Sequence, residues 1–153
     1  MKKLTPFLIS ALLVFGVAAC DNTSKTTVSA PSNPNEAVQT PTAQATEAAQ
    51  QDAQSEVRRR QLDADIRARE QRNNITGGDA DRAKADLSSQ VRSKLEANIP
   101  KGQITVDATS DGIVTVGGIV NNQQELAKIE PLAKEIKGVK TVVVKAIVAP
   151  PAN

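Results

Sequence analysis

Few residues of this chain could carry out covalent or acid-base chemistry. The sequence contains no histidine and a single cysteine, Cys20. Without histidine the chain lacks the usual general base near neutral pH, and one cysteine cannot form an internal disulfide. The 17 acidic residues are scattered among 19 basic ones, with no paired acids in an apolar stretch. The sequence therefore predicts a protein that is not an enzyme and that uses no cofactor, metal or small-molecule substrate.

The elements that position Cys20 are those of an export signal. Two lysines precede an apolar run over residues 7–17, and small residues follow. This run is shorter than the roughly 20 apolar residues that a transmembrane helix needs. A polar, proline-rich stretch begins at Asp21. We therefore expect residues 1–19 to be a signal peptide that is cleaved after Ala19.

The four residues Val17-Ala18-Ala19-Cys20 resemble the lipobox of bacterial lipoproteins. The resemblance implies that Cys20 becomes the new N-terminus and carries a diacylglyceryl group, and two acyl chains hold a protein stably on a membrane. The alternative is an ordinary secreted protein with a lone thiol in an oxidising compartment. Asp21 resembles the signal that keeps enteric lipoproteins in the inner membrane. Because that rule varies between bacterial lineages, the choice between inner and outer membrane stays open for this periplasm-facing protein.

Removal of residues 1–19 would change the composition of the chain. That segment holds both phenylalanines and two of the 19 basic residues, so the remainder has no aromatic side chain and 17 basic against 17 acidic residues. A nucleic-acid-binding protein usually has a basic face and often rings on which bases stack. The balanced charge and missing rings argue against nucleic acid as a partner.

Residues 20–42 are mainly Thr, Ser, Asn, Pro, Gln and Ala. Such a composition cannot bury enough apolar surface to offset the entropy of ordering, so it predicts a disordered tether from lipidated Cys20. Together with the next segment, the 58 residues 21–78 would span about 40 Å as a flexible coil. The sequence thus predicts a domain that searches the zone near the membrane on a long tether.

Residues 43–76 are rich in helix-forming Ala, Gln, Glu and Arg, with Glu56 and Arg60 spaced to pair along a helix. Large apolar residues are nearly limited to Val57, Leu62 and Ile66, too few for a coiled-coil seam. The pattern predicts a charged, solvated helical linker. Gly77 and Gly78 would then form a hinge before the folded domain.

Residues 79–148 have the periodicities of a small α+β domain. A four-residue apolar step predicts a first helix, ended by Pro100, and alternation then predicts a strand over residues 103–108. A Ser-Asp-Gly turn, a strand over 113–120, a helix with an Asn122–Glu125 capping box and a Val-rich strand over 139–148 follow. We expect an αββαβ domain with a three-stranded mixed sheet, both helices on one face, and a disordered tail over 149–153. The apolar stripe of the first helix would consist of Ala83, Leu87, Val91, Leu95 and Ile99.

Two glycine-centred motifs in this domain resemble the BON domain of bacterial envelope proteins. They are Gly112-x-Val114-x-Val116-x-Gly118-x-Val120 and Gly138-Val139-x-x-Val142-x-Val144. The resemblance covers nearly all of residues 79–148. It implies an envelope-associated domain whose commonly assigned activity is phospholipid binding, often in osmotic or envelope stress. We expect structural roles for these glycines, with Gly118 permitting a close backbone approach.

Two kinds of partner are compatible with this domain. Five lysines outnumber two glutamates after Leu126 and could contact anionic phospholipid, by electrostatics alone since no aromatic side chain can settle at the interface. The alternative is a protein or cell-wall partner, docked without lipid binding by the domain itself. Exposure of Val143 and Ile147 on a second apolar face of the sheet would favour a protein partner. The candidate lipid contacts are Lys128, Lys134, Lys137, Lys140 and Lys145.

Overall fold

The structure is a computed structural model that describes residues 23–38, 40–76 and 80–150. The predicted signal peptide, its cleavage site at Ala19, Cys20 and Asp21 lie outside this part, as do the Gly77-Gly78 hinge and residues 151–153. The side chains at 76 and 80–83, including that of Ala83, are also outside it.

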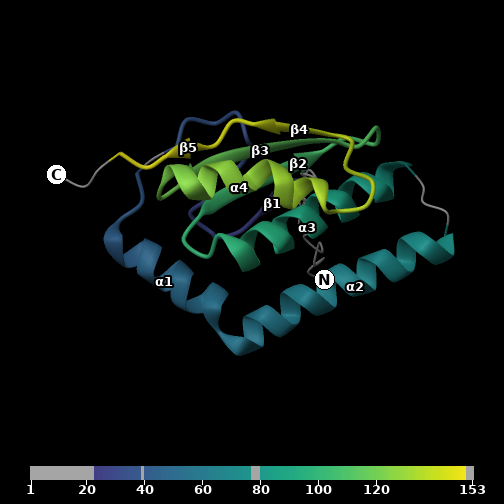
Figure 1. The fold of residues 1–153 in the computed structure, drawn as a ribbon, viewed down its shortest axis with the longest axis horizontal. Helices are drawn as coiled ribbons and strands as arrows, with labels where there is room; N and C mark the ends of the chain where they lie inside the picture. Colours follow the sequence, from purple (N-terminus) through teal and green to yellow (C-terminus); the bar gives the residue numbers. More distant parts are fainter. Residues whose placement is uncertain (1–22, 39, 77–79, 151–153) are drawn as a thin grey trace, which may run out of the picture.

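A mixed sheet with two helices on one face forms the centre of the molecule (Figure 1). Strand β2 (Gln103–Ala108) pairs antiparallel with β3 (Ile113–Val120). Helix α3 (Ala80–Asn98) precedes β2, and α4 (Gln123–Lys134) follows β3 and leads to a strand parallel to β3. The predicted α+β class and the predicted order of elements are therefore confirmed.

The final strand is divided into β4 (Thr141–Val144) and β5 (Ile147–Val148), both parallel to β3. The backbone amides of Lys145 and Ala146 both donate to the carbonyl oxygen of Val116, at 2.7 and 3.1 Å, which interrupts the regular ladder. Pairing also continues into the predicted disordered tail, because the amide of Ala149 donates to Val120 at 2.7 Å. The tail prediction is therefore wrong at its first residue.

The core between the helices and the sheet is aliphatic. The predicted stripe of α3 meets the inward faces of β2 and β3, and the apolar side of α4 closes the layer. Asn122 caps the start of α4, since its Oδ1 accepts the Glu125 amide at 2.8 Å. The Glu125 carboxylate accepts the Asn121 amide at 2.9 Å, one residue before the amide that a capping box would use. The buried members include Leu87, Val91, Leu95, Ile99, Ile104, Val106, Val114, Val116, Val120, Ile129 and Ile136.

The sheet has five strands rather than the three predicted, partly because the N-terminal segment joins it. Strand β1 (Ser24–Lys25) pairs antiparallel with the free edge of β2. Residues 24–38, which we call the strap, then cross the face of the sheet that the helices leave open. The Thr105 hydroxyl donates to the carbonyl oxygen of Pro31, and Pro34 lies against Gly117.

The strap contradicts the prediction of a disordered tether over residues 20–42 for its described part from residue 23. Backbone pairing to β2 and burial against the sheet offset the cost of ordering this polar segment, and neither is visible in its composition. The strap also buries the second face of β2, whose alternating sequence predicts a strand that is buried on one face only. Thr105, on the face away from the helices, has an exposed fraction of 0%.

Helices α1 (Ala43–Gln54) and α2 (Glu56–Thr76) form a further layer on the side of α3 away from the sheet (Figure 1). Ser55 separates them, with an extended backbone at φ −61° and ψ 139°. The predicted solvated linker is in fact packed on the domain, because Leu62 of α2 is 1% exposed. Among the described residues, no helix is both long enough and apolar enough to cross a bilayer.

Ion pairs between α2 and α3 attach α2 to the domain, because α2 has few apolar residues for packing. Arg58 donates to both carboxylate oxygens of Glu96, at 2.6 and 3.1 Å, and Arg69 donates to Asp86 at 2.7 Å. The hydrogen bond to Glu96 raises the pKa of the Arg58 guanidinium above its usual value. Both carboxylates belong to buried residues, where charge-assisted hydrogen bonds are stronger than at the surface.

We predict that Gly117→Val releases the strap while leaving the rest of the sheet folded. A Cβ at position 117 would lie 2.4 Å from the Cα and carbonyl oxygen of Pro34, a backbone contact that cannot yield. Limited trypsin digestion followed by mass spectrometry should show faster cleavage after Lys25, with unchanged far-ultraviolet circular dichroism of the β-sheet. The control, Thr115→Val, keeps the side-chain shape on the same face of β3 and should digest like the parent. Equal cleavage in both variants would mean that the strap does not depend on this contact.

Candidate functional site

The glycines of the two motifs meet at one end of the sheet. Gly112, in the turn between β2 and β3, accepts the amides of Lys140 and Thr141 at 2.8 and 3.3 Å through its carbonyl oxygen. Its own amide donates to Thr109 at 3.1 Å. A Cβ at Gly112 would lie only 2.3 Å from the carbonyl oxygen of Gly138. The turn at 109–112 and the link at 137–140 are thus locked together, and we call this region the glycine-turn end.

All three motif glycines have positive φ angles, which side-chain-bearing residues rarely adopt. These angles are 83° at Gly112, 114° at Gly118 and 100° at Gly138. Gly118 also makes the close approach that the sequence suggested, since a Cβ there would lie 2.0 Å from the carbonyl oxygen of Gln103. Val139, which follows Gly138 in the second motif, is partly buried and packs against the core.

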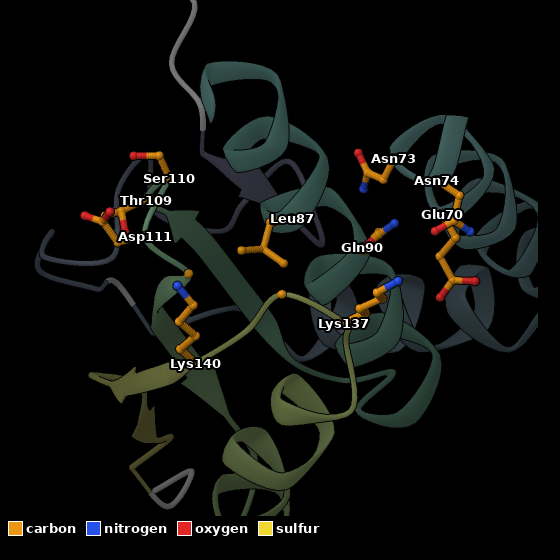
Figure 2. Close-up of a pocket in the computed structure, with 12 residues that line it drawn as sticks. Glu70, Asn73, Asn74, Leu87, Gln90, Thr109, Ser110, Asp111, Lys137 and Lys140 are labelled. Atoms are coloured by element: carbon orange, nitrogen blue, oxygen red, sulfur yellow. The ribbon is translucent and has the colours of Figure 1, made fainter. Parts of the chain in front are cut away.

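A hollow of about 570 Å³ lies beside the glycine-turn end, between it, the end of α2 and the first half of α3 (Figure 2). Gln90 lies on its wall with an exposed fraction of 2%, and the Nε2 atom of Gln90 is buried without a hydrogen-bond partner. Charged lining residues of both signs surround it. These are Lys137, Lys140, Glu70 and Asp111.

The hollow offers polar and charged contacts rather than a catalytic constellation. Its hydroxyls, Thr109 and Ser110, have no histidine to activate them, because the chain contains none. Within the described ranges, no group of three or more Cys, Asp or Glu side chains could hold a metal ion.

The five candidate lysines do not form one patch. Lys137 and Lys140 line the hollow at the glycine-turn end. Lys134 pairs with Glu130 of the same helix at 2.7 Å, and Lys145 donates to Asn35 Oδ1 of the strap. Lys128 is exposed on α4. The structure therefore groups only two of them, with Asp111 and Glu70 nearby to reduce their combined charge.

Exposed apolar side chains lie on either side of the strap, on the sheet face that it crosses. Because side chains alternate along a strand and Val143 lies opposite Thr115, both face the same side as Gly117. Ile147 lies opposite Ile119 on that side as well. The exposed fractions are 40% for Ile113, 38% for Val143 and 51% for Ile147. We call these three residues the open face.

Residues 83–150 match the family model of the BON domain. The chain contains a BON domain. The matched region includes both glycine motifs and overlaps the range of 79–148 that we expected from the sequence. No curated protein and no solved structure matches the chain. BON domains occur in bacterial envelope proteins, and the family is of a binding type that is not known to be enzymatic.

Sequence reasoning missed the strap and the glycine that accommodates it. Gly117 stands next to the motif glycine Gly118, and an unexplained second glycine in a strand is a signal for close approach of another backbone. The approaching segment, around Pro34, could not have been identified from its own residues, which are typical of linkers.

We predict that alanine substitution destabilises the BON domain far more at Gly112 than at Gly138. Both positions have positive φ and should each lose about 1–2 kcal/mol from backbone strain. Only Gly112 adds a backbone clash, whereas a Cβ at Gly138 meets nothing nearer than Leu87 Cδ1 at 3.7 Å. Urea unfolding followed by far-ultraviolet circular dichroism measures the difference. Equal losses at the two positions would show that the contact between the turns does not constrain the fold.

Proposed function

We propose that this chain is a bacterial envelope lipoprotein, held to a membrane by acyl chains on Cys20, whose BON domain docks another envelope protein. The observation that carries the proposal is the open face. Its three large aliphatic side chains are between 38 and 51% exposed, although they lie next to a fully formed core. Several exposed apolar side chains on one face of a small domain are typical of interaction sites.

The strap indicates which chemistry the open face would accept. It covers β2 and the Gly117 region with a proline-containing segment of turns and bends, so the same sheet face already binds a polypeptide segment in cis. A partner segment lying beside the strap, on the side of the glycine-turn end, would cover Ile113 and Val143, whereas Ile147 lies on the other side of the strap.

The edge of the sheet adds a second means of attachment. Strand β4 is the last in the order β1-β2-β3-β4, so its outer side carries no paired strand in the described chain. Exposed edges of this kind bind extended segments by strand addition, in which backbone hydrogen bonds give affinity and side-chain positions give specificity. Lys140 and Lys145 flank β4, which favours a partner segment with acidic residues at its ends.

Binding of anionic phospholipid by the domain is a second candidate function. It is supported by Lys137 and Lys140, both exposed at the glycine-turn end. Each lysine near an anionic leaflet contributes about 1 kcal/mol, enough to orient an anchored domain but not to recruit a free one strongly. Lipid contact of this kind would be sensitive to salt, because without aromatic side chains it rests on electrostatics.

We predict that a photo-crosslinking residue placed at Val143 or Ile147 of the membrane-anchored protein forms one discrete protein adduct in intact cells. The same residue at Val57, which is 68% exposed on α2, is the matched control and should give none. Adding Ile113→Lys to the Val143 crosslinker should remove the adduct by placing a charge on the open face. An adduct of twice the chain mass would identify a second copy of this chain instead of another protein. Crosslinking at Val57 with equal yield would contradict docking at the open face.

The two membrane contacts can be separated with the Cys20→Ser variant. We predict that this variant leaves the membrane fraction of cells, because the acyl chains supply most of the membrane affinity. The purified variant should float weakly with anionic liposomes at low salt, not with zwitterionic ones, and Lys137→Gln/Lys140→Gln should abolish that flotation. Lys128→Gln is the control. Absence of flotation in every condition would exclude lipid binding by the domain and leave the acyl anchor as its membrane contact.

A further inference from the structure

The start of the strap is fixed to the domain by several independent contacts. The Thr26 amide donates to Ile104 O at 2.9 Å, and the Ile104 amide donates to Thr26 Oγ1 at 2.9 Å. The Thr26 hydroxyl in turn donates to Gly102 O at 2.9 Å. Ser24 Oγ lies 3.2 Å from the hydroxyls of both Ser88 and Ser89 on α3. The chain is therefore part of the folded domain from Ser24 onward.

This attachment shortens the tether that the sequence suggested. Only three residues, 21–23, separate Ser24 from Cys20, the position that would carry the anchor. An extended chain advances at most about 3.6 Å per residue, so Cys20 lies within about 14 Å of Ser24 whatever path those residues take. The domain cannot search a wide zone, because it is held directly beside its own anchor.

The direction of β1 decides which end of the domain is nearest to the anchor. Strand β1 is antiparallel to β2, with Ser24 opposite Val106 and Lys25 opposite Thr105. Going from Lys25 back toward the N-terminus therefore follows β2 forward, toward Ala108 and the turn at 109–112. In Figure 2 the start of β1 lies close to Thr109 and Ser110. The anchor thus leaves the fold beside the glycine-turn end.

We infer that acylated Cys20 holds the glycine-turn end against the lipid headgroups, so that this end, with Lys137 and Lys140, is the membrane-facing surface of the domain. The inference rests on the proposed lipid anchor. Its occupant is the headgroup surface of the membrane that carries the anchor. The fold's other end, where β3 passes into α4 at Asn121–Gln124, then points away from the membrane, about 25 Å farther out along the eight residues of β3.

The short linker explains how two modest lysines suffice at this surface. A tether of three residues keeps the headgroups continuously within reach, which corresponds to a high effective concentration and needs little intrinsic affinity. The orientation also keeps the open face accessible. Strands β3, β4 and β5 run from the glycine-turn end outward, so the open face stands upright beside the membrane rather than against it.

Depth-dependent quenching on the full anchored protein in proteoliposomes tests this orientation. A single cysteine is introduced at Ser110 or at Gln124, both exposed, and labelled with a fluorophore, since acylation occupies the thiol of Cys20. The vesicles contain phosphatidylglycerol, phosphatidylcholine and a lipid with a quencher on its headgroup. We expect several-fold stronger quenching at position 110 than at 124. Inserting 20 Gly/Ser residues between Asn22 and Thr23, ahead of β1, should reduce the quenching at the two positions to similar values.

Failure of the anchor and failure of the orientation give different results. If the labelled protein does not float with the vesicles, Cys20 carries no acyl chains and the proposed lipoprotein function is wrong. If it floats but positions 110 and 124 are quenched equally, or 124 more strongly, the orientation inference is overturned while the anchor stands. Unchanged selectivity after the insertion would show that the short linker does not set the orientation, which also overturns the inference.

Discussion

The close approach of two backbones at Gly117 is the contact on which the arrangement of this molecule depends. A sheet covered by helices on one side leaves polar and aliphatic groups of the other side in water, and a small domain without aromatic rings has little core to spare. Pro34 can lie directly on β3 because position 117 has no Cβ. This contact, with the pairing of β1 to β2, buries the second face of β2 and incorporates the N-terminal segment into the fold.

The ion pairs between α2 and α3 have a structural role. Several arginines of α2 are paired with carboxylates of α3, and the buried Glu96 receives both Arg58 and Arg92. Breaking such a pair is costly because it leaves a charge in a poorly hydrated position, so these contacts specify where α2 lies even though its apolar residues are few. The helical layer therefore belongs to the domain and does not act as a spacer.

The functional surfaces follow from what these contacts leave uncovered. The strap crosses the middle of a sheet face and leaves the apolar side chains of the open face exposed on either side of it. The glycine turns place two lysines and a polar hollow at the end from which the proposed anchor would emerge. One end would thus face lipid while the side of the sheet remains free for a protein, and a single small domain could contact both.

The sequence by itself determined the elements of the BON domain and the α+β class. Local periodicity and capping chemistry fix the helices and strands of this region, and the bounds of β2 and β3 agree with those predicted. It also identified the glycines and the lysines, though not which lysines are grouped. Only the tertiary structure decided the fate of residues 23–76, because their ordering comes from pairing and burial against residues far away in the chain. The composition of a polar segment indicates how that segment behaves in isolation. It carries no information on whether a sheet edge or a buried carboxylate elsewhere in the chain will bind it.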